Sequence, residues 1–266
     1  GPGRRRARLA AAVGCLATMD ATTRRCLAAL SLTTLLAVSA CGDQGSTPPD
    51  EASDPGTITV TKDAEAEALD RPEQQQIDKA TARKALPTRA DMPSKDWLVD
   101  ISPASTYEPT YDPAECADVE LAGSDAKKFR DEHRKVNEKA RFSREKVNGG
   151  GIIATYVESH DEPYPHSIFD DAGAAIASCD DYTESNNAGP DSSYSAKAIS
   201  TPQIGDQTLA VRITSRDHDF YVDRMYVRSG HNLITVMTLG YDKDYDGKLM
   251  QDYAQGILDD LEKATS

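Results

Sequence analysis

The clearest pattern along the chain is an alternation of apolar and polar residues in its last third. In "TLAVRITSR" (208–216), Leu209, Val211 and Ile213 alternate with polar side chains, which is typical of a strand with one buried face. The segments "DFYVDRMYVR" (219–228) and "NLITVMTLG" (232–240) follow, separated by Ser229-Gly230-His231, a composition typical of a tight turn. These residues therefore predict three successive antiparallel strands.

A second pair of strands is expected earlier in the chain. The segments "ARFSREKV" (140–147) and "GIIATYVES" (151–159) are rich in residues that favour strands, and Asn148-Gly149-Gly150 lies between them. Asn-Gly sequences favour the turns that join hairpin strands, so the pattern predicts a β-hairpin.

Helical spacing replaces alternation in three other places. In "SIFDDAGAAIASC" (167–179), the apolar positions recur every three or four residues: Phe169, Ala172, Ile176 and Cys179. A C-terminal amphipathic helix is predicted in the same way by Leu249, Tyr253, Ile257 and Leu261. A further helix is expected over 124–136 with Ser124 as N-cap, and a polar loop over 183–193. Strand pair, helix, strand meander and helix predict an α+β fold, a mostly antiparallel sheet with helices packed against it.

Residues 19–41, "MDATTRRCLAALSLTTLLAVSAC", have the order of an export signal. Arg24 and Arg25 precede a short apolar run that ends in small residues and is too short to span a bilayer. The run 38–41 resembles the lipobox at which bacterial lipoproteins are cut before a diacylglyceryl-modified cysteine, here Cys41. The alternative is a buried helix with an incidental cysteine. Sec and twin-arginine export both remain open, and residues 1–18 are treated as upstream of the true start.

The body that follows is acidic and begins with a polar segment. Residues 1–40 hold six Arg and one Asp, so the remainder of the chain has a formal net charge of −19. Such a charge disfavours nucleic acids and anionic headgroups, so we expect membrane contact through the lipid anchor and no nucleic-acid partner. Residues 1–40 are predicted to be the signal peptide and the residues upstream of it. Residues 41–79 are predicted to be the lipidated cysteine and a disordered linker, and residues 80–266 one globular domain.

Two cysteines remain in the exported body once the signal and the anchor are set aside. In an oxidising compartment, Cys116 and Cys179 are expected to form one disulfide that closes a loop of about 60 residues. Two buried free thiols are the alternative. A zinc site is disfavoured because no CxxC or nearby Cys/His spacing is present.

Catalytic motifs were sought and not found. The chain has no GxSxG, no HExxH, no P-loop and no GxGxxG after a predicted strand. "SHDEPYPHS" (159–167) is the segment richest in functional groups: His160, Asp161, Glu162 and His166 have side chains that ligate metals, and Asp161 or Glu162 would suit a hydrolase. A plain polar loop explains the same residues, and no cofactor is expected.

The stretch "YDKDYDGKLMQDY" (241–253) matches the start of an EF-hand calcium loop. Asp242, Asp244 and Asp246 occupy the first three ligand positions, but Tyr253 stands where a bidentate glutamate is needed. The alternative needs no cation, because Asp246 is well placed to cap the last helix. We therefore weigh a weak calcium site against a helix cap.

Aromatic residues give a further hint about a binding site. Trp97, the one tryptophan of the chain, is interpreted as a core or cleft-wall residue. Several tyrosines are predicted to lie in loops, where binding sites are often built: Tyr107, Tyr111, Tyr164 and Tyr194.

Taken in order, residues 80–264 resemble the PknH-like extracellular domain, a sensor domain of actinobacterial serine/threonine kinases that also occurs in free-standing lipoproteins. The resemblance lies in "LPTRADMPSKDW" (86–97), Cys116, the helix ending at Cys179, "TPQIGDQTLAVRI" (201–213), the strands around Gly230 and the C-terminal helix. It implies a ligand-binding cleft, two disulfides and no assigned chemistry, whereas this chain can form one disulfide besides its anchor.

These observations together predict a non-enzymatic, lipid-anchored protein on the extracytoplasmic face of a bacterial membrane. It would bind an extracellular or cell-envelope ligand or partner protein, of unknown identity. The alternatives are an envelope hydrolase and a calcium-stabilised interaction module.

Overall fold

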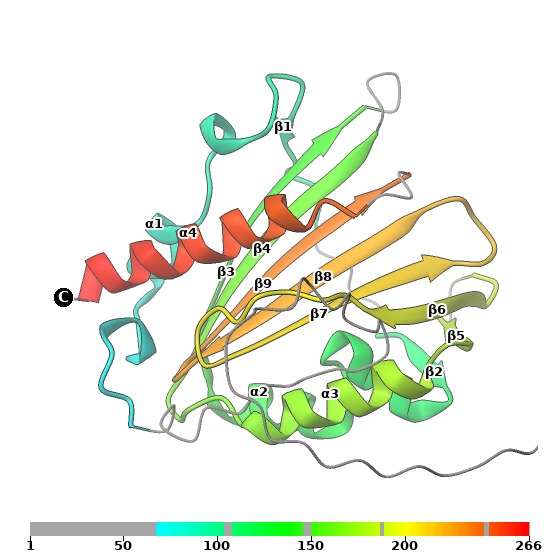
Figure 1. Cartoon of the computed structure of the whole chain (residues 1–266), viewed down its shortest axis with the longest axis horizontal. Helices are drawn as coiled ribbons and strands as arrows, with labels where there is room; N and C mark the ends of the chain where they lie inside the picture. Colours follow the sequence, from blue (N-terminus) through cyan, green and yellow to red (C-terminus); the bar gives the residue numbers. More distant parts are fainter. Residues whose placement is uncertain (1–67, 104–107, 146–149, 187–188, 242–244, 266) are drawn as a thin grey trace, which may run out of the picture. The chain divides into compact units, whose positions relative to one another are not determined.

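The computed structural model describes residues 68–103, 108–145, 150–186, 189–241 and 245–265. Cys41, the predicted signal peptide and most of the predicted linker lie outside these ranges. Within them, nine strands form one sheet in the order β1-β3-β4-β9-β8-β7-β6-β5-β2, and every pair of neighbours is antiparallel (Figure 1). The predicted α+β class is confirmed.

The strands are β1 (Leu98–Val99), β2 (Thr110–Asp112), β3 (Arg134–Arg144), β4 (Gly151–His160), β5 (Tyr182–Ser185), β6 (Ser192–Ala198), β7 (Gln207–Ser215), β8 (Tyr221–Ser229) and β9 (Asn232–Gly240). The helices are α1 (Lys79–Ala85), α2 (Ser124–His133), α3 (His166–Ser178) and α4 (Gly247–Thr265), with three 3₁₀ segments, η1 (Pro72–Gln74), η2 (Arg89–Asp91) and η3 (Ala114–Glu120).

Both faces of the central strands are buried under helices. Along β8, Met225 and Val227 belong to the cluster beneath α1 and α4, whereas Tyr226 belongs to the cluster with α3 and η3. The two clusters alternate because successive side chains of a strand point to opposite faces of the sheet. The sheet therefore separates two hydrophobic cores.

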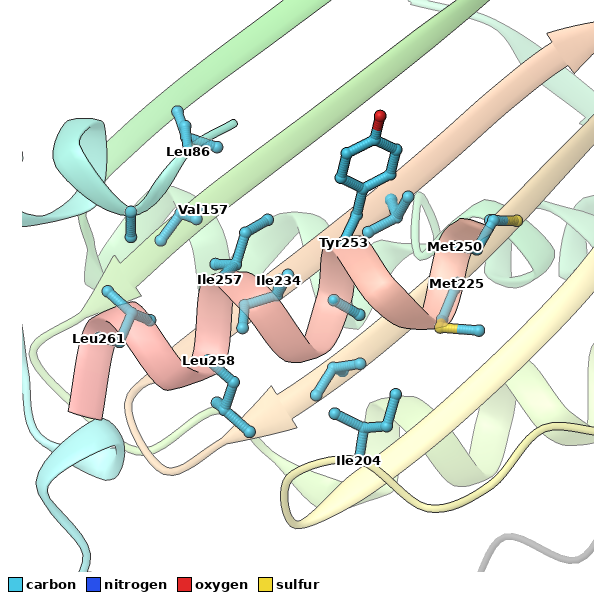
Figure 2. Packing of buried hydrophobic residues seen from close by; sticks show 14 of the residues in the cluster. Leu86, Val157, Ile204, Met225, Ile234, Met250, Tyr253, Ile257, Leu258 and Leu261 are labelled. Atoms are coloured by element: carbon cyan, nitrogen blue, oxygen red, sulfur yellow. The ribbon is translucent and has the colours of Figure 1, made fainter. Parts of the chain in front are cut away.

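The C-terminal helix α4 covers one face through a row of apolar side chains, as its spacing predicts. Met250, Ile257 and Leu261 are at most 2% exposed. Figure 2 shows this row directed at the sheet, where it packs against Ile234 and Val157. Burial of such a side chain contributes about 1.5–3 kcal/mol relative to exposure, so α4 is a major part of this core.

On the opposite face, a disulfide joins η3 to the end of α3. Cys116 and Cys179 are bonded with their Cα atoms 5.8 Å apart, and both are 1% exposed. The predicted bridge is confirmed, and Cys179 leaves the buried side of its helix as the spacing indicated. Its sequence separation of 63 corresponds to about 4 kcal/mol of lost loop entropy in the unfolded chain.

The folded region begins earlier than the sequence suggested, because residues 71–75 are bound to the turn between β8 and β9. The buried Asp206 carboxylate accepts hydrogen bonds from Gln74 Nε2 at 3.1 Å and from Gly230 N at 2.7 Å, and it forms an ion pair with Arg71. His231 N donates to Gln74 O at 2.9 Å. The predicted linker, 41–79, thus extends too far, because its polar residues find partners in the fold.

Gly230 is required at this contact. Its φ is +54°, and a Cβ there would lie 2.3 Å from Gln74 O. Asn232 Nδ2 completes the attachment with donations of 2.8 Å to the carbonyls of Glu73 and Gln75.

Two other local predictions need correction. The helix expected over 124–136 ends at His133, since Arg134 already begins β3, and its N-cap is Gly123 with no side-chain cap. The loop expected over 183–193 contains most of β5 and the start of β6. These strands are short and mostly polar, and they are held by pairing with β2 and β7 and by a few side chains, such as Tyr182 and Ala196, in the α3-face cluster.

Replacing both disulfide cysteines by serine is expected to lower the free energy of unfolding by about 2–4 kcal/mol, because the unfolded chain regains its freedom. Urea denaturation of the oxidised protein and the Cys116→Ser/Cys179→Ser variant measures this loss. Reduction of the unmodified protein should cause a similar loss and leave the variant unchanged. Equal stability of all forms would show that the bridge contributes nothing.

Candidate functional site

A cleft of about 490 Å³ opens on the α4 face of the sheet, beyond the first turn of α4. Its floor is formed by the ends of β3, β4, β9 and β8, and its lining includes Trp97, Asp246 and Leu249. The volume falls within the range of ligand pockets, so this cleft is the leading candidate site.

Strand register explains why the floor is hollow. Arg144 on β3 lies opposite Gly151 on β4, and Tyr221 on β8 lies opposite Gly240 on β9. Arg144, Gly151, Gly240 and Tyr221 thus form one row across the four strands, and the two residues in the middle of this row have no side chain. A Cβ on Gly240 would meet no atom within 4 Å, whereas Gly151 has a φ of +129° and adjoins the Trp97 ring.

One wall of the cleft is a stacked pair of side chains. The Arg144 guanidinium lies 5.0 Å from the centroid of the Trp97 ring, a cation–π arrangement, and Arg144 Nε donates to Gly150 O at 3.3 Å. Trp97 is 6% exposed and belongs to the α4 core. The interpretation of Trp97 as a core or cleft-wall residue is confirmed, because it is both.

The opposite wall is a second arginine on an aromatic ring. The Arg212 guanidinium lies 4.8 Å from the Tyr221 centroid and binds the Asp223 carboxylate through two hydrogen bonds, of 2.7 and 2.9 Å. The centroid of the Tyr245 ring lies 6.0 Å from the same guanidinium. Burial, followed by the charge of Asp223, raises the pKa of Tyr245 to about 12, so its hydroxyl stays protonated at neutral pH.

Large exposed apolar side chains follow Trp97 in the chain, and one such side chain lines the cleft. Val99 and Ile101 follow Trp97 at alternate positions and are 58% and 91% exposed, and Tyr241, which lines the cleft, is 50% exposed. With Leu98, these are the large apolar side chains most exposed in the part of the chain that the structure describes.

The carboxylates of the cleft have structural partners. Asp223 binds Arg212, and Asp246 Oδ1 accepts from Leu249 N at 3.0 Å, which caps α4. Among the described residues that line this cleft there is no histidine or cysteine. A cleft of stacked arginines, tyrosines and bare backbone is suited to holding a ligand.

A second hollow, of about 300 Å³, is a weaker candidate. It is lined by Leu69, Tyr164 and Arg228 among others. Arg228 Nε donates to Tyr164 O at 2.7 Å, and Tyr164 is fully buried, so these groups already serve the fold.

The residues of the 159–167 segment do not form a metal site. His160 is buried, with Nδ1 3.1 Å from His231 O, and the described residues contain no group of three ligating side chains placed to hold a metal ion. Asp161 contacts Lys135 at 2.7 Å and His133 at 2.9 Å, and these hydrogen bonds lower its pKa. Asp161 is therefore an ion-pair partner, without the raised pKa that a general acid needs.

Of the three aspartates in the calcium prediction, only Asp246 lies within the described residues. Asp242 and Asp244 lie outside the described residues, whereas Asp246 caps α4 as its alternative interpretation predicts. Because α4 begins at Gly247, the second half of the EF-hand pattern is helical, and Tyr253 Oη donates to Asp91 O at 2.9 Å instead of facing an ion. Calcium binding by Asp242, Asp244 and Asp246 stays a prediction.

The tyrosines predicted to mark a site lie elsewhere. Tyr111 and Tyr194 are in β2 and β6, where their ring centroids lie 6.3 and 5.8 Å from that of Tyr182 on the α3 face, and Tyr107 is outside the described residues. The cleft residues missed by the sequence reasoning are Arg144, Gly151, Tyr221 and Gly240. A signal existed in the two glycines at strand ends, where backbone is often left open to a ligand.

Comparison with known proteins identifies the fold. No family model and no curated protein matches the chain. Among solved structures, the crystal structure of the extracellular domain of PknH from Mycobacterium tuberculosis matches with a TM-score of 0.53 and 13% identity, over 71% of this chain and 99% of that one. An uncharacterised Mycobacterium smegmatis protein, an Rv0999 ortholog, matches over the same shares with 12% identity and a TM-score of 0.38. The chain therefore has a PknH-like extracellular domain fold.

The cap and calcium interpretations of Asp246 predict different results. With EDTA present, Asp246→Ala should lower the free energy of unfolding by about 1 kcal/mol because α4 loses its N-cap, whereas Asp246→Asn should retain most of it. Chemical denaturation measures both. A large stabilisation of the unmodified protein by calcium, abolished in Asp246→Asn, would instead favour the calcium site.

Proposed function

We propose that this protein is a non-enzymatic ligand-binding protein, anchored by a lipid on Cys41 to the extracytoplasmic face of a bacterial membrane. The observation that carries the proposal is the cleft on the α4 face, lined by stacked arginines and aromatic rings above a bare backbone floor. Its occupant is an extracellular or cell-envelope ligand or partner.

The anchor and the compartment rest on the sequence. A basic, apolar and small-residue order precedes Cys41, and the disulfide between Cys116 and Cys179 is typical of proteins outside the cytosol. Within the described ranges, no helix combines the length and apolar composition that crossing a membrane requires. The match to a kinase extracellular domain agrees with an exported sensor domain.

Binding without catalysis is the function that the cleft chemistry favours. The two cleft carboxylates within the described residues are both engaged, Asp223 by Arg212 and Asp246 by the first turn of α4. Acid–base catalysis needs a carboxyl or imidazole free to exchange a proton at the reacting atom. The hydrolase alternative, with Asp161 or Glu162, predicts turnover of glycans or esters that disappears in Glu162→Gln.

Lipidation of Cys41 is expected to place the full chain in the membrane fraction. Cys41→Ser should abolish the added lipid mass and block maturation at this site, whereas Cys26→Ser, within the same signal, should change neither. Mass spectrometry of the protein from its native membrane measures this. An unmodified Cys41 in membrane-extracted protein would contradict the anchor.

Ligand binding in the cleft should be blocked by filling its floor. We expect a component of a panel of cell-wall fragments, lipids and cations to raise the melting temperature of the full chain, and Gly240→Phe to remove that shift. Gly256→Phe is the matched control, because a Cβ at Gly256 also meets no atom within 4 Å but lies on the exposed side of α4. A panel without effect, or a shift that survives Gly240→Phe, would contradict the proposal.

A further inference from the structure

The two arginines of the cleft differ in charge balance. Arg212 is neutralised by its double hydrogen bond to Asp223. For Arg144, the interactions within the described residues are stacking on Trp97 and one donation from Nε to the Gly150 carbonyl, with no carboxylate in ion-pair contact. Arg144 therefore keeps a full positive charge at the wall of the cleft.

This charge stands in a strongly acidic chain. The region after residue 40 has a formal net charge of −19, so its long-range field repels anions. Most arginines of the described ranges accordingly have acidic partners: Arg71, Arg83, Arg134, Arg141, Arg212, Arg216 and Arg224. An unneutralised guanidinium inside a cleft is a local exception that favours a negatively charged occupant.

Arg144 is also held in place before any ligand arrives. The Trp97 ring supports the guanidinium, and the bond from Nε to Gly150 O restricts its rotation, whereas the terminal nitrogens have no hydrogen-bond partner among the described residues. A planar guanidinium donates two parallel hydrogen bonds to a carboxylate or phosphate. Because the side chain is already ordered, less conformational entropy is lost on binding.

The floor beside Arg144 accepts the rest of such a ligand. From β3 the row continues through Gly151 and Gly240 to Tyr221, and three strand intervals make it roughly 14 Å long. The Trp97 ring lies against Gly151, whereas the backbone at Gly240 has open space above it, so an uncharged part of a ligand can lie over Gly240.

We propose that the cleft takes a ligand bearing a carboxylate or phosphate, and that Arg144 binds this group. The proposal rests on the proposed function, in that the cleft is the ligand site. The anionic group belongs either to a small polar molecule, such as a sugar acid, or to the headgroup of a lipid.

The test uses Trp97 as its own reporter, because the full chain has one tryptophan. Tryptophan fluorescence of the full chain is titrated with two pairs of probes that differ only in the acidic group. Glucuronate and glucose form the polar pair, and dihexanoyl phosphatidic acid and dihexanoylglycerol form the lipid pair. Midpoints, rather than intensities, are compared between variants, because loss of the stacked arginine alters the fluorescence of Trp97 itself.

In at least one pair, the acidic probe should saturate the signal while its neutral partner binds roughly 10- to 100-fold more weakly, as expected for a charge-assisted hydrogen bond. Arg144→Gln should remove this difference, Arg144→Lys should restore part of it, and Arg216→Gln, an exposed arginine paired with Asp181, should leave it unchanged. The pair that responds identifies the source of the anion.

Equal binding of acidic and neutral probes, or acidic binding that persists in Arg144→Gln, would overturn the anionic class while leaving the cleft as a ligand site. Silence of all four probes would also overturn it, and the melting-temperature panel with Gly240→Phe judges the proposed function independently. Circular dichroism of each variant establishes that it is folded, so loss of the fold is distinguished from loss of the anion contact.

Discussion

The structure depends on the need to bury both faces of its central strands. β7, β8 and β9 have residues in both apolar clusters, so exposing either face to water would be unfavourable. Each face therefore needs a cover of its own. On one face the cover is α4, a long helix with an apolar row, and on the other it is α3 with the irregular segment η3. The remaining features of the fold serve to keep these covers in place.

Each cover is accompanied by a second segment, α3 by η3 and α4 by the segment before α1. These two segments are held by different physical means. η3 is a 3₁₀ segment with few regular hydrogen bonds, so a covalent link between Cys116 and Cys179 fastens it to α3. The segment before α1 is fastened by polar contacts instead. There, the Asp206 carboxylate is removed from water and compensated by Arg71, Gln74 and the Gly230 amide. Loss of one partner would leave a buried charge unmatched, which makes this network sensitive to substitution.

The sequence reasoning succeeded where burial imposes a period and failed where pairing alone defines the structure. The strands β7, β8 and β9 and the helix α4 were predicted because a one-sided or alternating apolar pattern follows directly from their burial. Most of β5 and the start of β6 were interpreted as loop, since segments such as "YTES" (182–185) have almost no apolar face. The cleft was missed for a different reason. Arg144, Gly151, Gly240 and Tyr221 become neighbours only through strand register, which one sequence does not specify.

The cleft itself is a consequence of where one cover begins. Asp246 accepts a hydrogen bond from the first turn of α4, so the helix starts at Gly247 and the strand ends beyond it remain uncovered. An apolar side chain at Gly240 would expose hydrophobic surface there, and glycine avoids this while leaving space. The stacking of Arg144 on Trp97 then shields the edge of the core and places a positive charge over the space. The same residues that end the core cleanly therefore build a cleft able to hold an anion.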